Sequence, residues 1–262
     1  MKNIKTFIIL ASILCFFAQQ GFAEQNISFE AGGLHLATDN LWYQNLEYET
    51  DISENNLVHG GFKYGQFDNK QAGLFKMGII HTLDDYDIHL QIGQKLASHA
   101  IAPWADGYYS IRTEYYYDDA LSFAPLYEYY RQTHNIDYQK LSFRATYQGQ
   151  IAHHDYIIYL MPATGALTND NRIVSDMPYS ATVGGLYYLN PLYFIAFENT
   201  IGQSDYQYED ILYNIPYHGF YHAKSSLNYK IRPESLVSLQ ANLLHFSQDN
   251  HIGGMIRYQQ AF

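Results

Sequence analysis

Apolar and polar residues alternate along most of this chain, as in β-strands whose two faces meet different surroundings. The clearest stretch, 137–147, places four apolar side chains on one face and four polar side chains on the other. The apolar residues are Leu141, Phe143, Ala145 and Tyr147, and the polar residues are Lys140, Ser142, Arg144 and Thr146. Fourteen stretches of this kind predict fourteen strands of roughly ten residues each, long enough to cross a bilayer when tilted.

The predicted strands are joined by connections of two kinds. The strands are 27–36, 41–50, 56–66, 72–80, 86–95, 107–117, 121–131, 137–147, 151–161, 179–189, 192–202, 217–229, 235–245 and 250–262. Short turns, such as Asp118-Asp119, Asn190-Pro191 and 148–150, join them at one end. Three longer loops join them at the other end and begin at Leu96, Pro162 and Gln203. A slip in the alternation at Gly32-Gly33 predicts a β-bulge in the first strand.

Strand length, strand number and the connections together favour a membrane barrel. Strands of soluble proteins average five to six residues, which is much shorter than the stretches predicted here. An even strand count, with short turns at one end and long loops at the other, is typical of bacterial outer-membrane barrels. We therefore predict an all-β fold, a transmembrane antiparallel up-and-down β-barrel of 14 strands, with 12 as the alternative count. The alternation by itself is also compatible with a soluble β-sandwich.

The N-terminal residues have the features of a secretory signal. Two lysines precede an apolar run over 7–17, and small residues occupy Gly21 and Ala23, where a signal peptidase needs them. We expect a signal peptide over 1–23 and one outer-membrane barrel domain over 24–262. The only cysteine, Cys15, lies within the signal, so the exported chain would carry no disulfide.

Composition changes this picture little but excludes some functions. The 27 tyrosines suit a membrane–water interface, where the ring is apolar and the hydroxyl is hydrated. The formal net charge is −11, from 15 Lys and Arg against 26 Asp and Glu. Nucleic-acid binding needs clustered basic residues, so this balance disfavours it.

Two segments carry a resemblance to a known family. They are 42–49, which reads Trp-Tyr-Gln-Asn-Leu-Glu-Tyr-Glu, and 225–262, a hairpin with an Arg-Pro-Glu turn that leads to a terminal Phe. With these features the chain resembles the YaiO-type outer-membrane barrel family. The resemblance implies an outer-membrane location, a porin-like barrel and a role related to polysaccharide export. It also implies that the barrel-assembly machinery reads Phe262 as an assembly signal.

If the apolar faces meet lipid, the polar faces line the barrel lumen. Seven basic residues would then point inward, and we take them as candidate lumen-lining binding residues: Lys63, Lys76, Arg112, Lys140, Arg144, Lys224 and Arg257. The acids predicted on the same faces are Asp87, Glu114, Glu128 and Glu198. One interpretation is a pathway or binding surface for anionic groups. The other is an ion-pair network that stiffens the barrel, for example between Arg112 and Glu128.

Candidate catalytic and metal-binding residues are few. His153 and His154 are adjacent in a predicted strand and would point to opposite faces, while His218 and His222 would lie about 13 Å apart along another. Neither pair can share one ion, so we expect no metal and no cofactor. Acidic loop residues could bind divalent cations that bridge lipopolysaccharide, although a solvated loop is the better explanation: Asp170, Asp176, Asp205, Glu209 and Asp210.

No G-x-S-x-G motif and no glycine-rich phosphate loop occurs in the sequence. We therefore expect no enzymatic activity and predict a channel or export conduit for an anionic or saccharide solute. The alternatives are a barrel-type lipid-modifying enzyme and a surface receptor or adhesin. The expected partners are outer-membrane lipid, the barrel-assembly machinery and the transported solute.

Overall fold

The computed structural model describes residues 25–35, 40–67, 70–95, 106–131, 136–169, 172–173, 179–203, 206–208, 211–213, 219–246 and 249–262. The predicted signal peptide over 1–23 and the predicted acidic loop residues lie outside the described residues. No helix that could span a membrane occurs within these ranges.

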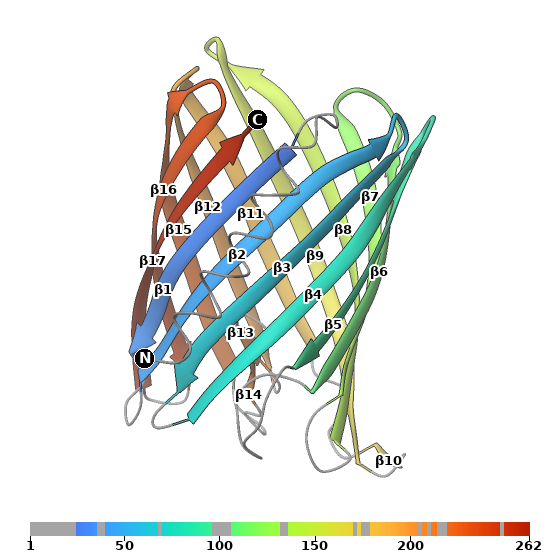
Figure 1. Cartoon of the computed structure of the whole chain (residues 1–262), viewed down its shortest axis with the longest axis vertical. Helices are drawn as coiled ribbons and strands as arrows, with labels where there is room; N and C mark the ends of the chain where they lie inside the picture. The colour runs from blue at the N-terminus through green and yellow to red at the C-terminus, as the bar shows by residue number, and fades with distance from the viewer. Residues whose placement is uncertain are drawn as a thin grey trace.

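Fourteen long strands form one closed antiparallel sheet (Figure 1). They are β1 (Gln25–His35), β2 (Asn40–Ser53), β3 (Asn56–Phe67), β4 (Lys70–Leu83), β5 (Tyr86–Lys95), β6 (Gly107–Tyr116), β7 (Leu121–Arg131), β8 (Ile136–Ile151), β9 (His154–Asn169), β11 (Tyr179–Asn190), β12 (Tyr193–Gln203), β15 (Gly219–Arg232), β16 (Ser235–Phe246) and β17 (Asp249–Ala261). The short β10 (Arg172–Ile173) pairs with β9, and β13 (Tyr206–Tyr208) pairs with β14 (Ile211–Tyr213) in a separate small sheet.

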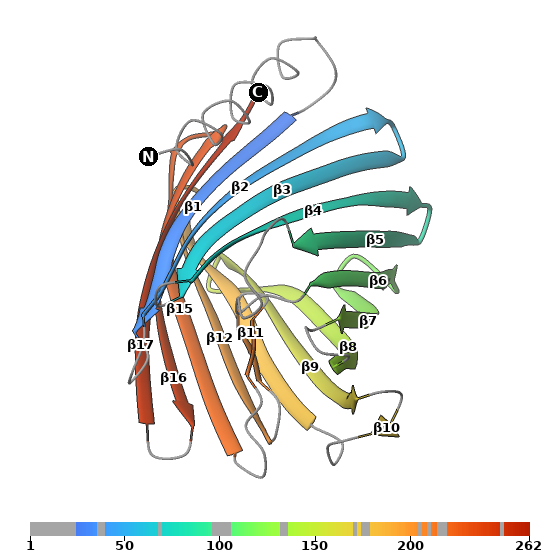
Figure 2. The ribbon, with the colours of Figure 1, turned by 60° about the horizontal axis from the view of Figure 1, so that its bottom comes forward.

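The ring closes between the first and the last long strand. β1 pairs with β17 over ten residue pairs, from Asn26 opposite Ala261 to His35 opposite Ile252. Figure 2 shows β1 between β17 and β2, so no long strand is left with an open edge. The prediction of a 14-stranded antiparallel barrel is confirmed. Gln25 and Phe262 exchange backbone hydrogen bonds at one end of the barrel, which we call the terminal end.

Two of the predicted local features, a bulge and a turn, differ in the structure. The predicted bulge at Gly32-Gly33 is wrong, because both glycines pair in unbroken register with β2 and β17. The predicted turn at 148–150 is also wrong. β8 runs through Gly149 to Ile151, and the turn is formed by Ala152 and His153, so β9 begins later and continues to Asn169 instead of ending before Pro162.

Ala152 and His153 have φ angles of 51° and 69°, the left-handed values that a two-residue hairpin turn requires. Asn-Gly is the preferred pair for such a turn, because Asn tolerates and Gly favours positive φ. We expect the double substitution Ala152→Asn, His153→Gly to raise the free energy of unfolding by about 1 kcal/mol. A urea titration of protein refolded into lipid vesicles measures this. Leu192→Gly, in a turn without positive φ among its described residues, is the control and should lower stability.

The two faces of the sheet differ as the alternation predicts. Large apolar side chains on the outer face are exposed because no part of the described chain covers them. They include Ile92, Leu141, Leu160, Ile201, Ile252 and Ile256. A soluble protein rarely exposes so continuous an apolar surface, whereas a membrane barrel places such a band against lipid. The inner face carries most of the charged residues of the strands.

Candidate pore lumen

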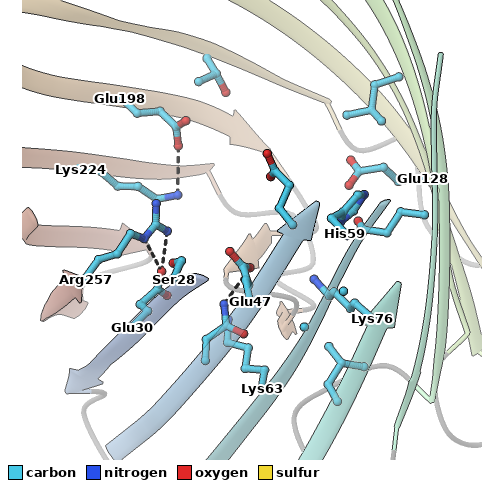
Figure 3. Close-up of a pocket in the computed structure, with 18 of the residues that line it drawn as sticks. Ser28, Glu30, Glu47, His59, Lys63, Lys76, Glu128, Glu198, Lys224 and Arg257 are labelled. Carbon is cyan, nitrogen blue, oxygen red and sulfur yellow. Dashed lines mark hydrogen bonds and ion pairs between the residues drawn. The ribbon is translucent and has the colours of Figure 1, made fainter. Parts of the chain in front are cut away.

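Inward side chains from strands all around the barrel line a cavity of about 620 Å³. Five glutamates and five lysine or arginine side chains contribute to its wall: Glu30, Glu47, Glu49, Glu128 and Glu198, and Lys63, Lys76, Lys140, Lys224 and Arg257. Figure 3 shows eight of them, all except Glu49 and Lys140, with their labels. Uncharged hydrogen-bonding residues fill much of the remaining wall: Asn26, Ser28, Asn45, Gln91, Ser180, Thr182, Thr200 and Gln259.

The seven basic residues that the sequence singled out all lie on the inward side of their strands. Five of them line the cavity, as given above. Arg112 and Arg144 are not part of its wall and lie nearer the terminal end, where both approach the carboxylate of Glu114. Whether any of the seven binds a solute stays a prediction.

Register decides which charges meet in the cavity wall. Glu128 lies directly opposite Lys140, and Glu198 lies directly opposite Lys224. The ammonium nitrogens approach these carboxylates to 3.3 Å and 3.1 Å. Directly opposed residues on one face of a sheet have the closest side chains. The register therefore places a lysine of the adjacent strand beside each of these two glutamates.

Glu30 forms the third pair of this kind. It lies directly opposite Arg257, whose guanidinium reaches its carboxylate at 2.5 Å (Figure 3). The Glu30 side chain is almost completely buried. The pair therefore links the first and last strands of the barrel by a charged contact in addition to their backbone ladder.

The pairing of Arg112 with Glu128 that the sequence suggested does not occur. Arg112 lies opposite Leu126, and Glu128 bonds instead to Lys140 and to the hydroxyl of Tyr130. Sequence places both residues on the inner face, but an offset of two residues along the strand separates them. Alternation alone fixes the face of a side chain and leaves its cross-strand partner open.

Arg112 and Arg144 belong to a polar cluster beside the cavity. Arg144 donates to both oxygens of the Glu114 carboxylate, at 3.0 and 2.9 Å, while Arg112 lies 4.0 Å from the same group. Arg112 also donates to the ring of His89 at 3.0 Å. Two guanidiniums thus share one carboxylate, with Ser122 donating to it as well. The contacts tie β5, β6, β7 and β8 together at the terminal end.

The Tyr159 side chain extends over Gly184 and forms a hydrogen bond with the Glu198 carboxylate. Its hydroxyl donates to the Glu198 carboxylate at 2.6 Å, and Lys224 approaches the same carboxylate from the other side. Gly184 lies between Tyr159 and Glu198 in the register, and the phenol ring lies directly over it. A Cβ atom at Gly184 would be 2.3 Å from the Tyr159 ring and hydroxyl. The absence of a side chain at this position lets the phenol reach the carboxylate.

Sequence reasoning missed three of the carboxylates that line the cavity, namely Glu30, Glu47 and Glu49. The incorrect bulge in the first strand concealed the face of Glu30. Glu47 and Glu49 alternate with Leu46 and Tyr48 in the predicted strand 41–50, and this alternation could have placed them inward.

No group of three or more potential metal ligands occurs within the described ranges. His153 lies in the turn after β8 and not in a strand, which corrects the predicted position. His154 bonds to the backbone oxygen of Tyr188 at 3.0 Å and packs against Tyr187. His222 is buried on the inner face, and His218 lies outside the described residues.

Phe262 follows the last residue of β17 at the terminal end. Its backbone N–H donates to the carbonyl of Gln25 at 2.8 Å, and its ring is 69 % exposed. The side chain is therefore open to another molecule, but its reading by the assembly machinery stays a prediction.

Comparison with known proteins agrees with the fold. No family model and no curated protein matches the chain. Among solved structures it is similar to the CymD monoaromatic hydrocarbon channel, with a TM-score of 0.57, 8% identity and coverage of 93% of this chain and 90% of that one. It is also similar to the Acinetobacter baumannii outer membrane protein Omp33, with a TM-score of 0.52, 10% identity and coverage of 92% and 98%.

A third similar structure is a bacterial polysaccharide outer membrane secretin, with a TM-score of 0.50, 9% identity and coverage of 92% of this chain and 98% of that one. Identities this low show a shared fold and do not identify the YaiO-type family. The closed ring of strands, the apolar outer surface and the shared fold lead to one conclusion. The chain is an outer-membrane β-barrel protein of fourteen strands.

Proposed function

We propose that the protein is a conduit through the outer membrane for polar solutes, with saccharides as the favoured class. The observation that carries the proposal is the cavity of about 620 Å³ enclosed by inward polar side chains from most strands of the barrel. A lumen with such a lining is hydrated, and pore lining determines which solutes pass. The outer apolar band would contact membrane lipid, and Phe262 would serve as the assembly signal.

The lining favours saccharides over anions. Three of the five bases in the wall are matched by carboxylates within 3.3 Å, so the wall is not uniformly cationic. Amide and hydroxyl groups of the wall can both donate and accept hydrogen bonds, as the hydroxyls of a saccharide require. The resemblance to YaiO-type barrels and the similar fold of a polysaccharide secretin support the same class. An anionic solute stays the second candidate, and the five basic side chains of the wall are the groups that it would approach.

Conductance measurements on refolded protein in a planar bilayer test the conduit. We expect stepwise ionic conductance, which a neutral oligosaccharide lowers at concentrations where a polyethylene glycol of similar size has less effect. The polymer is the matched control, because it occupies volume but offers no hydroxyl pattern along its chain. Folded protein, identified by its heat-modifiable gel mobility, that shows no conductance would contradict the proposal.

A further inference from the structure

Two carboxylates of the cavity wall differ from the other three in their neighbours. Glu30, Glu128 and Glu198 each have an arginine or lysine as a direct cross-strand partner, at 2.5 to 3.3 Å. Glu47 and Glu49 of β2 have none. Among the described residues no ion pair involves either of them.

The partners of Glu47 and Glu49 are neutral or small. Glu47 lies between Ser28 of β1 and Gly61 of β3 in the register. The partners of Glu49 in the same two strands are Asn26 and His59. The register therefore supplies no lysine or arginine beside either carboxylate. An amide hydrogen bond from Asn45 to Glu47, at 2.9 Å, leaves the negative charge in place.

Two lysines on the neighbouring strands β3 and β4, Lys63 and Lys76, each place the ammonium beside an aromatic ring. Lys76 of β4 extends over Gly93, and its ammonium lies 5.2 Å from the ring centre of Tyr108 on β6, on the side away from β2. The ammonium of Lys63 lies 4.4 Å from the ring centre of Tyr43, which is four residues before Glu47 on β2. Lys63 is only 5 % exposed. Figure 3 shows Glu47, Lys63 and Lys76 on three successive strands of the wall.

The Glu47 side chain is exposed within the barrel, and Glu49 follows on the same face at a spacing of about 7 Å. Asp51, two residues further along β2, continues this row towards the terminal end. The row places like charges along one side of the lumen. Rings or rows of carboxylates in a pore attract cations and repel anions.

We infer that Glu47 and Glu49 make the lumen selective for cations over anions. The inference rests on the proposed conduit and specifies the charge of what passes through it. Neutral saccharides and cationic solutes would pass more readily than anionic ones of the same size. Selectivity would depend on salt, since the screening length is about 10 Å at 0.1 M and about 3 Å at 1 M.

The reversal potential across a planar bilayer under a KCl gradient tests this inference. We expect the wild-type protein to favour K⁺ over Cl⁻ at about 0.1 M KCl and to lose most of this preference at about 1 M KCl. Glu47→Gln with Glu49→Gln should lower the permeability ratio by about twofold or more at low salt. Glu234→Gln removes the same charge from an exposed turn at the terminal end and should leave the ratio unchanged.

The outcomes separate the inference from the proposed function. Conductance with an unchanged ratio in the double variant would overturn the assignment to Glu47 and Glu49 while the conduit stands. Folded wild-type protein without conductance would remove the conduit itself. If the double variant fails to fold, the single substitution Glu47→Gln is decisive, because this exposed side chain has one amide contact to lose.

Discussion

Leu90→Arg should destabilise the barrel by about 2–4 kcal/mol, whereas Gln91→Arg, one residue further along β5, should change stability little. Leu90 lies on the outer face near the middle of β5 and is 45 % exposed. Gln91 points to the opposite face and lines the cavity. An arginine at Leu90 would be placed in the hydrocarbon core of the bilayer, while one at Gln91 would be placed in a hydrated lumen.

The two variants are a matched pair, because the strand, the depth and the new residue are the same. Urea titrations of both proteins, refolded into vesicles of one lipid, give the free energies of unfolding. Equal stability of the two variants would mean that the outer face meets water, and the membrane assignment would be wrong. Gln91→Arg should in addition shift ion preference towards anions, which Leu90→Arg would not do if it folds.

The faces of the strands could be predicted from sequence because lipid and lumen impose different chemistry at a period of two residues. The stretch 137–147 shows this directly, since Leu141 and Phe143 are exposed on the outer face while Lys140 lines the cavity. β5 and β7 begin and end where the alternation begins and ends. The strand number follows from the same signal repeated along the chain.

A turn that lacks Gly, Pro, Asn, Asp and Ser could not be predicted from the sequence. Gly149 is a strong local signal for a turn, but the strand continues through it because its neighbours keep pairing with β9. Ala152 and His153 form the turn, although positive φ is uncommon for alanine and histidine is a weaker turn signal than the nearby glycine. The cross-strand ladder on both sides overrides this local preference.

Cross-strand partners could not be predicted either. A shift of two residues preserves the alternation of a strand but changes every neighbour, so the sequence did not distinguish Arg112 from Lys140 as the partner of Glu128. The alternation could have placed Glu47 and Glu49 on the inner face. Only the cross-strand register shows that neither of them lies opposite a lysine or an arginine.

Gly184→Ala should destabilise the barrel by about 2–3 kcal/mol, from crowding and from the loss of a hydrogen bond to a charged group. The added Cβ would lie 2.3 Å from the Tyr159 ring, which must move away from the Glu198 carboxylate that its hydroxyl now contacts. Gly60→Ala is the control. A Cβ at Gly60 meets only the backbone oxygen of Lys76, at 3.6 Å, so this variant should be as stable as the wild type or slightly more so.

A double-mutant cycle identifies the cause of the Gly184→Ala effect. Tyr159→Ala removes the ring that covers Gly184, so in this background Gly184→Ala should cost much less than in the wild type. The coupling energy between the two positions would then approach the full cost of the single substitution. If Gly184→Ala costs the same in both backgrounds, the clash with Tyr159 is not its cause, and Gly184 would be required by the strand itself. A large coupling would instead establish that glycine is needed here because Tyr159 must pass over it to reach Glu198.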